Sequence, residues 1–239
     1  MTVDVLAIGS HPDDVELGCG GTLAKLASRG RSVGILHLTK GERGTRGTVE
    51  ERQAEAERAA EVLGASEMVF LDFGDGGLRR GEVEEDALIA ELRRLRPEIV
   101  LGPAPADRHP DHRRAHLLVA DACFYAGLAR RGEGKPYRPA AVFSYMQHDP
   151  FTPSFVVDVS DSWSLKQDAL AEYESQLYQP GKDRDEPKTK VASLEFRDAM
   201  EGRARHFGLL IGATYGEPFW SRLPLAVADP FLLAPGGLR

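Results

Sequence analysis

Short apolar runs alternate with amphipathic segments along the first half of the chain. Runs rich in Val, Ile and Leu predict buried strands at residues 3–9, 32–39, 67–73 and 98–105. Apolar positions at helical spacing predict helices at residues 15–30, 48–64 and 84–97. Because strands and helices alternate, the pattern favours an α/β fold, in which a mostly parallel, Rossmann-like sheet carries helices on both faces.

The second half of the chain is less regular. Two further strands are predicted at residues 139–146 and 154–160. Three further helices are predicted at residues 106–130, where a polar loop comes first, and at residues 162–177 and 194–210. Ser162 is expected to cap the helix that it begins. Residues 222–239 are expected to be irregular. No internal repeat divides the chain, so we expect one domain over residues 1–239.

The composition is that of a folded, acidic protein. Hydrophobic residues make up 42% and charged residues 28% of the 239 positions, which argues against a disordered chain. The formal net charge of −7 disfavours nucleic acid as a partner, since binding to phosphates needs a basic surface. Two cysteines, Cys19 and Cys123, are too few for a disulfide framework. Without a signal-peptide pattern or a long apolar stretch, we expect a cytoplasmic protein that binds no membrane.

The candidate chemistry lies in two similar motifs, each at the end of a predicted strand. "HPDD" occupies residues 11–14 after the first strand, and "HPDH" occupies residues 109–112 after the fourth. A single His-Pro-Asp sequence is usually a turn, because Pro fixes φ and Asp bonds to its own backbone. Ligands of open α/β sheets bind outside the carboxyl ends of the strands. Two copies at that edge therefore favour an active site there.

The residue types of these motifs suit a catalytic metal ion. His11 and Asp14 have the i,i+3 spacing that places two side chains on one helix face, and His112 would complete three ligands for zinc. Iron(II) accepts the same donors. Asp13 would take a proton from water activated by the ion. A protonated His109 would stabilise an oxyanion, with Asp111 holding and orienting its ring.

Other residues near these motifs have simpler interpretations. His37 lies inside an apolar strand and is expected in the core, and His116 is expected to pack in its helix. His148 and His206 would reach the site from the second half, which the sequence does not decide. The glycines of "GCGG" suggest dinucleotide binding. The two carboxylates that stand where that fingerprint needs glycine would repel a pyrophosphate, and they argue against NAD.

Both motifs resemble those of a known enzyme family. "SHPDDVELGCGG" and "RHPDH" are similar to the paired motifs of the LmbE/PIG-L group of zinc-dependent N-acetylglucosamine deacetylases, and the resemblance covers nearly the whole chain. "GERGTRGTVEER", "FSYMQH", "PGKDRDEPKT" and "GRARHFG" look most like the bacillithiol-pathway branch, which removes acetate from N-acetyl-α-D-glucosaminyl L-malate. The resemblance implies the roles already assigned, with zinc as the cofactor and His109 as the acid oriented by Asp111.

The resemblance also implies roles for two arginines and an oligomeric assembly. It implies that Arg52 lines the substrate pocket and that Arg108 is a clamp for the malate carboxylates, since a guanidinium binds a carboxylate bidentately. Without the resemblance, Arg52 is equally well explained as a solvated residue on a Glu-rich helix face. Family members are often hexamers, and the apolar residues 230–237 agree with a homo-oligomer.

Two rival functions stay open at the level of the sequence. The first is a deacetylase of another N-acetylglucosamine conjugate, bearing inositol, a second sugar as in a chito-oligosaccharide, or an antibiotic scaffold. The second is a metal- or sugar-binding protein without turnover. The pairing of Asp13 with His109 disfavours the second rival, because binding alone needs no base.

Overall fold

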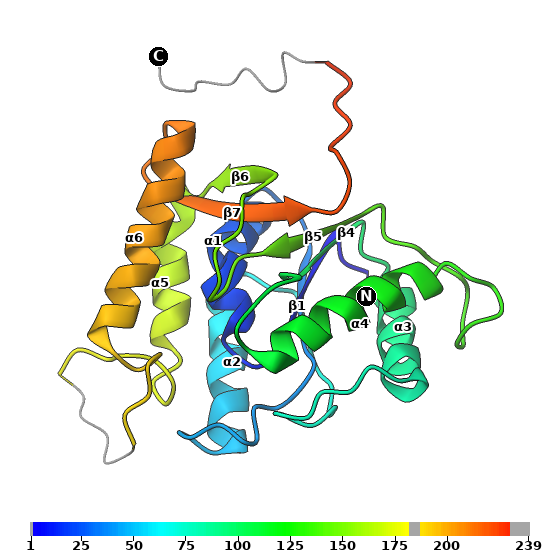
Figure 1. The fold of residues 1–239 in the computed structure, drawn as a ribbon, viewed down its shortest axis with the longest axis horizontal. Coiled ribbons are helices and arrows are strands. Elements are labelled where there is room, and N and C mark those ends of the chain that lie inside the picture. Colours follow the sequence, from blue (N-terminus) through cyan, green and yellow to red (C-terminus); the bar gives the residue numbers. More distant parts are fainter. Residues whose placement is uncertain (1, 182–186, 230–239) are drawn as a thin grey trace.

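A single mixed sheet organises the computed structural model, which describes residues 2–181 and 187–229 (Figure 1). Its strands, within those residues, are β1 (Val5–Gly9), β2 (Val33–His37), β3 (Glu67–Phe70), β4 (Ile99–Pro103), β5 (Ala141–Tyr145), β6 (Phe155–Asp158) and β7 (Gly216–Ser221). Their order is β3-β2-β1-β4-β5-β7-β6. The first five strands are parallel, and β7 runs antiparallel to both of its neighbours.

Helices connect these strands and cover the sheet. They are α1 (Asp14–Ser28), α2 (Val49–Leu63), α3 (Glu82–Leu95), α4 (Pro110–Tyr125), α5 (Trp163–Ala171) and α6 (Leu194–Ile211). Local sequence sets several of their ends. Thr48 and Glu51 form a capping box at the start of α2, and Gly64 ends that helix in the left-handed conformation. In the described ranges, no helix combines the length and the apolar character needed to cross a membrane.

The central strand β1 shows why both faces of the sheet are covered. All of its residues are buried, and neighbouring side chains enter different apolar clusters. Val5 and Ala7 pack in the cluster that includes residues of α1, α2 and α5. Leu6 and Ile8 pack in the cluster that includes residues of α3 and α4. The predicted α/β fold, with a mostly parallel sheet and helices on both faces, is confirmed.

The second half of the chain departs from the sequence prediction in two elements. Strand β7 was not predicted, because Gly216, Glu217 and Pro218 break any apolar or alternating pattern at its start. Helix α5 ends at Ala171 rather than at residue 177. Beyond α5, Ser175 donates from its backbone N–H and its hydroxyl to the Glu55 carboxylate of α2, so tertiary bonds replace helical ones.

The predicted cap of α5 is also wrong. Ser162 makes no side-chain cap bond. Its hydroxyl donates instead to the backbone carbonyl of Gly21 on α1, at 2.7 Å. The association expected for the apolar residues 230–237 falls outside the described residues, as do residues 182–186 of the motif "PGKDRDEPKT".

Helix α1 is broken near its middle and repaired by groups from distant elements. Cys19 has non-helical backbone angles, φ −146° and ψ 17°. The Glu217 carboxylate of β7 accepts hydrogen bonds from the backbone N–H groups of Gly21 and Thr22, at 3.0 and 2.7 Å. Lys166 of α5 donates to the Leu17 carbonyl and to Glu217, at 2.9 and 2.6 Å. The pair of Lys166 and Glu217 therefore provides hydrogen-bond partners for backbone groups of α1 that the break leaves without helical partners.

The glycines of "GCGG" serve close packing. A Cβ on Gly18 would collide with the ring of Tyr145, which is fully buried and donates from its hydroxyl to the Ile8 carbonyl at 2.9 Å. A Cβ on Gly21 would press on Val159 and on Glu217. These contacts give Gly18 and Gly21 a structural purpose in α1.

Candidate active site

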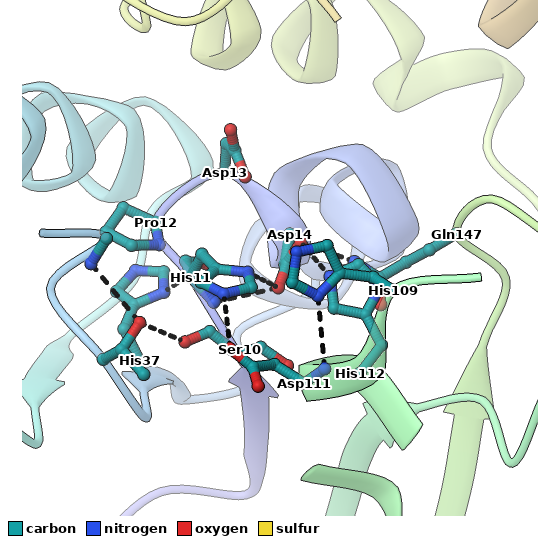
Figure 2. A network of polar contacts seen from close by, with 12 residues as sticks. Ser10, His11, Pro12, Asp13, Asp14, His37, His109, Asp111, His112 and Gln147 are labelled. Atoms are coloured by element: carbon teal, nitrogen blue, oxygen red, sulfur yellow. Dashed lines mark hydrogen bonds and ion pairs between the residues drawn. The ribbon is translucent and has the colours of Figure 1, made fainter. Parts of the chain in front are cut away.

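The two His-Pro-Asp loops meet at the carboxyl ends of β1 and β4, as the sheet order requires (Figure 2). The ring centroids of His11 and His109 lie 4.8 Å apart, and those of His109 and His112 lie 4.6 Å apart. A pocket of about 260 Å³ opens over these rings. Its lining also contains Asp13, Asp14 and further residues from the loops after β2 and β3 and from α6.

The first loop sends its two consecutive carboxylates in different directions. Asp14 begins α1 and accepts a hydrogen bond from the backbone N–H of His11 at 2.9 Å. Asp13 precedes the helix with φ 101°, a value that residues with a Cβ rarely adopt. The Asp13 side chain therefore points away from Asp14 (Figure 2). It lies 3.9 Å from the guanidinium of Arg52.

The second loop fixes its histidines through the backbone and through Asp107. His109 caps α4, Pro110 fills the first helical position, and His109 Nδ1 accepts the Asp111 backbone N–H at 3.2 Å. This contact places the proton of a neutral His109 ring on Nε2. The Asp107 carboxylate accepts the His109 backbone N–H at 2.8 Å and lies 3.0 Å from His112 Nδ1.

Three of the side chains fit a zinc ion. The structure places His112 Nε2 3.2 Å from Asp14 Oδ1 and His11 Nδ1 3.4 Å from Asp14 Oδ2. Two imidazoles and a carboxylate are a donor set that zinc accepts in catalytic sites, with one position left for water or substrate. The remaining nitrogen of His112 faces Asp107, an arrangement that orients ligating histidines.

The cluster is also built to hold positive charge. Burial alone would lower the pKa of His11, but the carboxylates of Asp111 and Asp14 raise it well above the usual value, with a further contribution from Asp75. Burial acts in the same direction on His112, yet Asp14 and Asp107 raise its pKa to about 9. A divalent cation between these groups would satisfy the same carboxylates.

Asp13 and His109 differ from the ligand candidates in their electrostatics. Burial raises the pKa of Asp13 to about 7, against the opposing charge of Arg52. Burial and the charges on His11 and His112 lower the pKa of His109. The structure thus favours a neutral His109 ring, whereas the sequence interpretation used a protonated one.

Asp111 has different neighbours from those expected. Its Oδ2 accepts the Gly76 backbone N–H at 2.7 Å and lies 3.4 Å from His11 Nε2. Its Oδ1 accepts a hydrogen bond from Arg114 at 3.1 Å. The contact of Asp111 with His109 comes from its backbone N–H instead of its carboxylate. The carboxylate therefore faces a ligand candidate, because the loop after β3 draws it there.

The two predicted arginines lie in different surroundings. Arg52 is buried, lines the pocket, and donates to the backbone carbonyls of Gly41 and Pro12 at 2.8 and 2.9 Å. The solvated-face interpretation of Arg52 is therefore wrong. Arg108 is exposed, and it is absent from the described lining of the pocket.

The other histidines separate clearly. His37 is fully buried, as predicted, and its Nδ1 lies 3.2 Å from the His11 carbonyl. His116 lies 3.0 Å from the Pro103 carbonyl, in agreement with a packing role. His148 lines the pocket and stacks on His112 with centroids 5.4 Å apart. His206 is exposed on α6.

Three polar residues that contact His11, His112 or Asp14 were missed by sequence reasoning. Asp75 lies 3.1 Å from His11 Nε2, Asp107 holds the second loop, and Gln147 donates to Asp14 Oδ1 at 2.6 Å. Each of them follows the carboxyl end of a parallel strand, β3, β4 or β5. That placement was a usable signal, since ligands bind at this edge.

Comparisons with known proteins agree with the fold and the motifs. The family model described as PIG-L, GlcNAc-PI de-N-acetylase, matches residues 6–123. A diacetylchitobiose deacetylase of Thermococcus kodakarensis is 34% identical over 229 residues, which cover 89% of this chain and 80% of that protein. The crystal structure of a conserved protein from Thermus thermophilus has a TM-score of 0.87 and 39% identity, and it covers 95% of this chain and 98% of its own.

The relatives differ in the reactions that their names state. A 4-oxalmesaconate hydratase of Pseudomonas putida is 30% identical over 183 residues, which cover 69% of this chain and 70% of that protein. Similarity over most of the chain therefore extends to a protein named for hydration as well as to one named for deacetylation.

Proposed function

Because this chain belongs to the PIG-L family of de-N-acetylases, we propose that it hydrolyses the acetamide of an N-acetylglucosamine conjugate, N-acetyl-α-D-glucosaminyl L-malate. The observation that carries the proposal is the meeting of Asp13 and His109 with the donor set of His11, Asp14 and His112 around one pocket. Binding of a sugar alone would need neither a carboxylate base nor an imidazole donor beside that set.

We assign His11, Asp14 and His112 as the ligands of a zinc ion. When bound, zinc would supply Lewis acidity, which lowers the pKa of water and polarises a carbonyl oxygen. Asp107 and Gln147 hold two of these ligands in place, through His112 Nδ1 and Asp14 Oδ1. Asp75 and Asp111 do the same for His11 from its Nε2 side.

Asp13 and His109 carry out the proton chemistry in this proposal. Asp13 is the carboxylate of the first loop that is turned away from the ligand set, so it can accept a proton from the water that attacks the acetamide carbon. His109 donates a hydrogen bond from Nε2 to the carbonyl oxygen as negative charge develops there. The proton taken up by Asp13 is then available for the amine, which leaves when the C–N bond breaks. Acetate and a free glucosamine amine are the products.

The malate part of the proposal is supported by the resemblance of the loop motifs and by Arg43. Arg43 is an exposed residue of the pocket lining, and its guanidinium has no polar partner within residues 2–181 and 187–229. A free guanidinium at the pocket suits a dicarboxylate aglycone. Arg108 stays a predicted clamp, although it lies outside the described lining of the pocket.

Acetate release tests the proposal. The substrates are the malate conjugate, an inositol conjugate, diacetylchitobiose and free N-acetylglucosamine, each with metal-replete and chelated protein. Chelator-sensitive release from the malate conjugate, at least tenfold faster than from the others, would support the full proposal. Preference for another conjugate would remove malate. No acetate from any of them would favour a binding protein or a hydratase, since hydration releases no acetate.

The metal, the assembly and the compartment need their own measurements. Elemental analysis of protein purified without added metal distinguishes zinc from iron(II). Light scattering of the full chain tests the predicted homo-oligomer, for which we expect a hexamer. The cytoplasmic location also stays a prediction, which fractionation of the source cells would check.

A further inference from the structure

A second cavity adjoins the candidate active-site pocket and differs from it in polarity. It has a volume of about 190 Å³ and shares Leu17, Val191, Phe196 and Met200 with the pocket. Beyond these shared residues, its walls are largely apolar, with Leu170, Ala171 and Leu177 of α5 and the segment that follows. Polar side chains also take part in the lining: Gln167, Tyr178, Gln179 and Arg197. The apolar cavity, as we call this space, therefore continues the pocket away from the histidines.

The pocket has a polar end and an apolar end. Arg43 and Thr45 follow β2 and Asp75 follows β3, and these two strands form one end of the sheet. The apolar side chains Phe196 and Met200 come from α6, which packs against β6 and β7 at the other end. The His-Asp cluster follows β1 and β4, between these ends. A substrate over the cluster thus meets polar groups on one side and apolar side chains on the other.

The difference in polarity between the two ends of the pocket predicts how an N-acylated sugar would lie in it. Sugar hydroxyls and carboxylates need hydrogen-bond partners, and Arg43, Thr45 and Asp75 supply them at the polar end. The acyl group is the apolar part of the substrate and is expected at the other end. Leu17 marks the passage, because it follows Asp13 and Asp14 by one turn of α1 and borders both spaces. Its backbone N–H bonds to the Asp13 carbonyl at 2.9 Å.

We propose that the apolar cavity is a subsite for the N-acyl chain, so that the protein also hydrolyses glucosamine amides with acyl chains of four to six carbons. This inference rests on the proposed amide hydrolysis. The chemistry is the same: water oxygen bonds to the acyl carbon, the C–N bond breaks, and the amine receives the proton. A liquid water occupies about 30 Å³. A cavity of about 190 Å³ therefore has room for several methylene groups beyond an acetyl methyl.

The test is a chain-length series on one sugar. N-acetyl-, N-butanoyl- and N-hexanoylglucosamine, with the malate aglycone where it can be made, are compared by release of free amine. Each buried methylene is worth up to about fourfold in transition-state binding. We expect kcat/KM for the hexanoyl amide to exceed that for the acetyl amide. A steady fall of more than tenfold with each two carbons would overturn the proposal.

Variants of the cavity wall sharpen the test. Ala171 is an exposed residue at the end of α5 that lines the apolar cavity and is outside the pocket lining. Ala171→Trp should fill the cavity and lower the hexanoyl-to-acetyl ratio of kcat/KM at least tenfold, while Ala171→Ser, the matched control, keeps the ratio. Gln167→Trp, on the same wall, gives a second blocking variant if the first does not fold. Equal ratios in all variants would overturn the proposal.

Further experiments determine whether the acyl chain or the aglycone occupies the apolar cavity. They also separate this inference from the proposed function. Octyl and benzyl glycosides of N-acetylglucosamine carry the apolar group on the aglycone. If Ala171→Trp impairs these instead of the acyl series, the cavity serves the aglycone and the proposal is wrong. If no amide is cleaved at all, the proposed function fails, and calorimetric binding of N-hexanoyl- against N-acetylglucosamine still decides the subsite. Tighter hexanoyl binding that Ala171→Trp abolishes would support it, and equal binding would overturn it.

Discussion

The same three residues, His-Pro-Asp, form two different structures in this molecule. After β1, the helix begins at the fourth residue, Asp14, and the third residue is held at φ 101°. After β4, the helix begins at the second residue, Pro110, and His109 caps it from an extended conformation. Where the helix starts decides which side chain faces the pocket and which faces the backbone.

The two loops are alike in where they place the side chain of the fourth residue. Asp14 and His112 hold this position, and their side-chain atoms lie 3.2 Å apart. The first residue of each motif, in contrast, has different surroundings in the two loops. His11 is surrounded by carboxylates, whereas His109 is bonded to its own helix terminus. Two copies of a motif therefore need not double one role. In the proposed function, the two copies divide metal binding and proton chemistry differently between their positions.

The largest effects on bound metal and activity are expected when the two histidines of the second loop are replaced one at a time. His112→Ala removes a predicted ligand, so we expect loss of bound metal and of all measurable activity. His109→Ala should keep the metal and lower kcat by about 10²–10⁴-fold. Mass spectrometry of the bound metal, alongside acetate release, separates the two outcomes. Metal loss in both variants would contradict the division of roles.

Asp13→Asn addresses the first loop, and its effect should be smaller than that of His112→Ala. The amide has the shape of the carboxylate and tolerates a positive φ, but it accepts no proton at neutral pH. We expect about 10²–10⁴-fold loss of kcat with unchanged metal content. Near-normal turnover would show that another group is the base.

The residues that orient the ligands should have intermediate effects. Asp107→Asn weakens the support of His112, and Gln147→Ala weakens that of Asp14. Loss of such partners lowers metal affinity by about 10- to 100-fold. Competition with a chromophoric chelator measures this change directly. Unaltered affinity in both variants would mean that the loops hold the ligands without these contacts.

The smallest predicted effect concerns backbone strain. In metal-free protein, Asp13→Gly should raise the free energy of unfolding by about 1 kcal/mol relative to Asp13→Ala, because glycine adopts φ 101° without strain. Both substitutions remove the carboxylate, so their difference isolates the backbone. Urea unfolding of the two variants checks it. Equal stability would mean that this loop bears no strain.

The parts of the molecule that the sequence predicted are those where local pattern and fold agree. The α/β alternation predicted β1 to β4 and their helices, and the strand ends then brought both motifs together. Strand β7 carries no local pattern at its start, and Gly216 is required there because a Cβ would collide with Val156 and with the backbone of α6. The Asp111 carboxylate turns to His11 because a glycine of the β3 loop holds it, a contact between residues 35 positions apart.

The bridge of Lys166 and Glu217 has a consequence for biosynthesis. The ribosome releases residues 11–14 well before Glu217, which follows Gly21 by 196 positions. At ribosomal speeds of about 5–20 residues per second, α1 waits on the order of ten seconds or more for the carboxylate that serves its second half. Nascent chains therefore carry the first loop on an unfinished helix, and we expect metal uptake to follow the synthesis of β7.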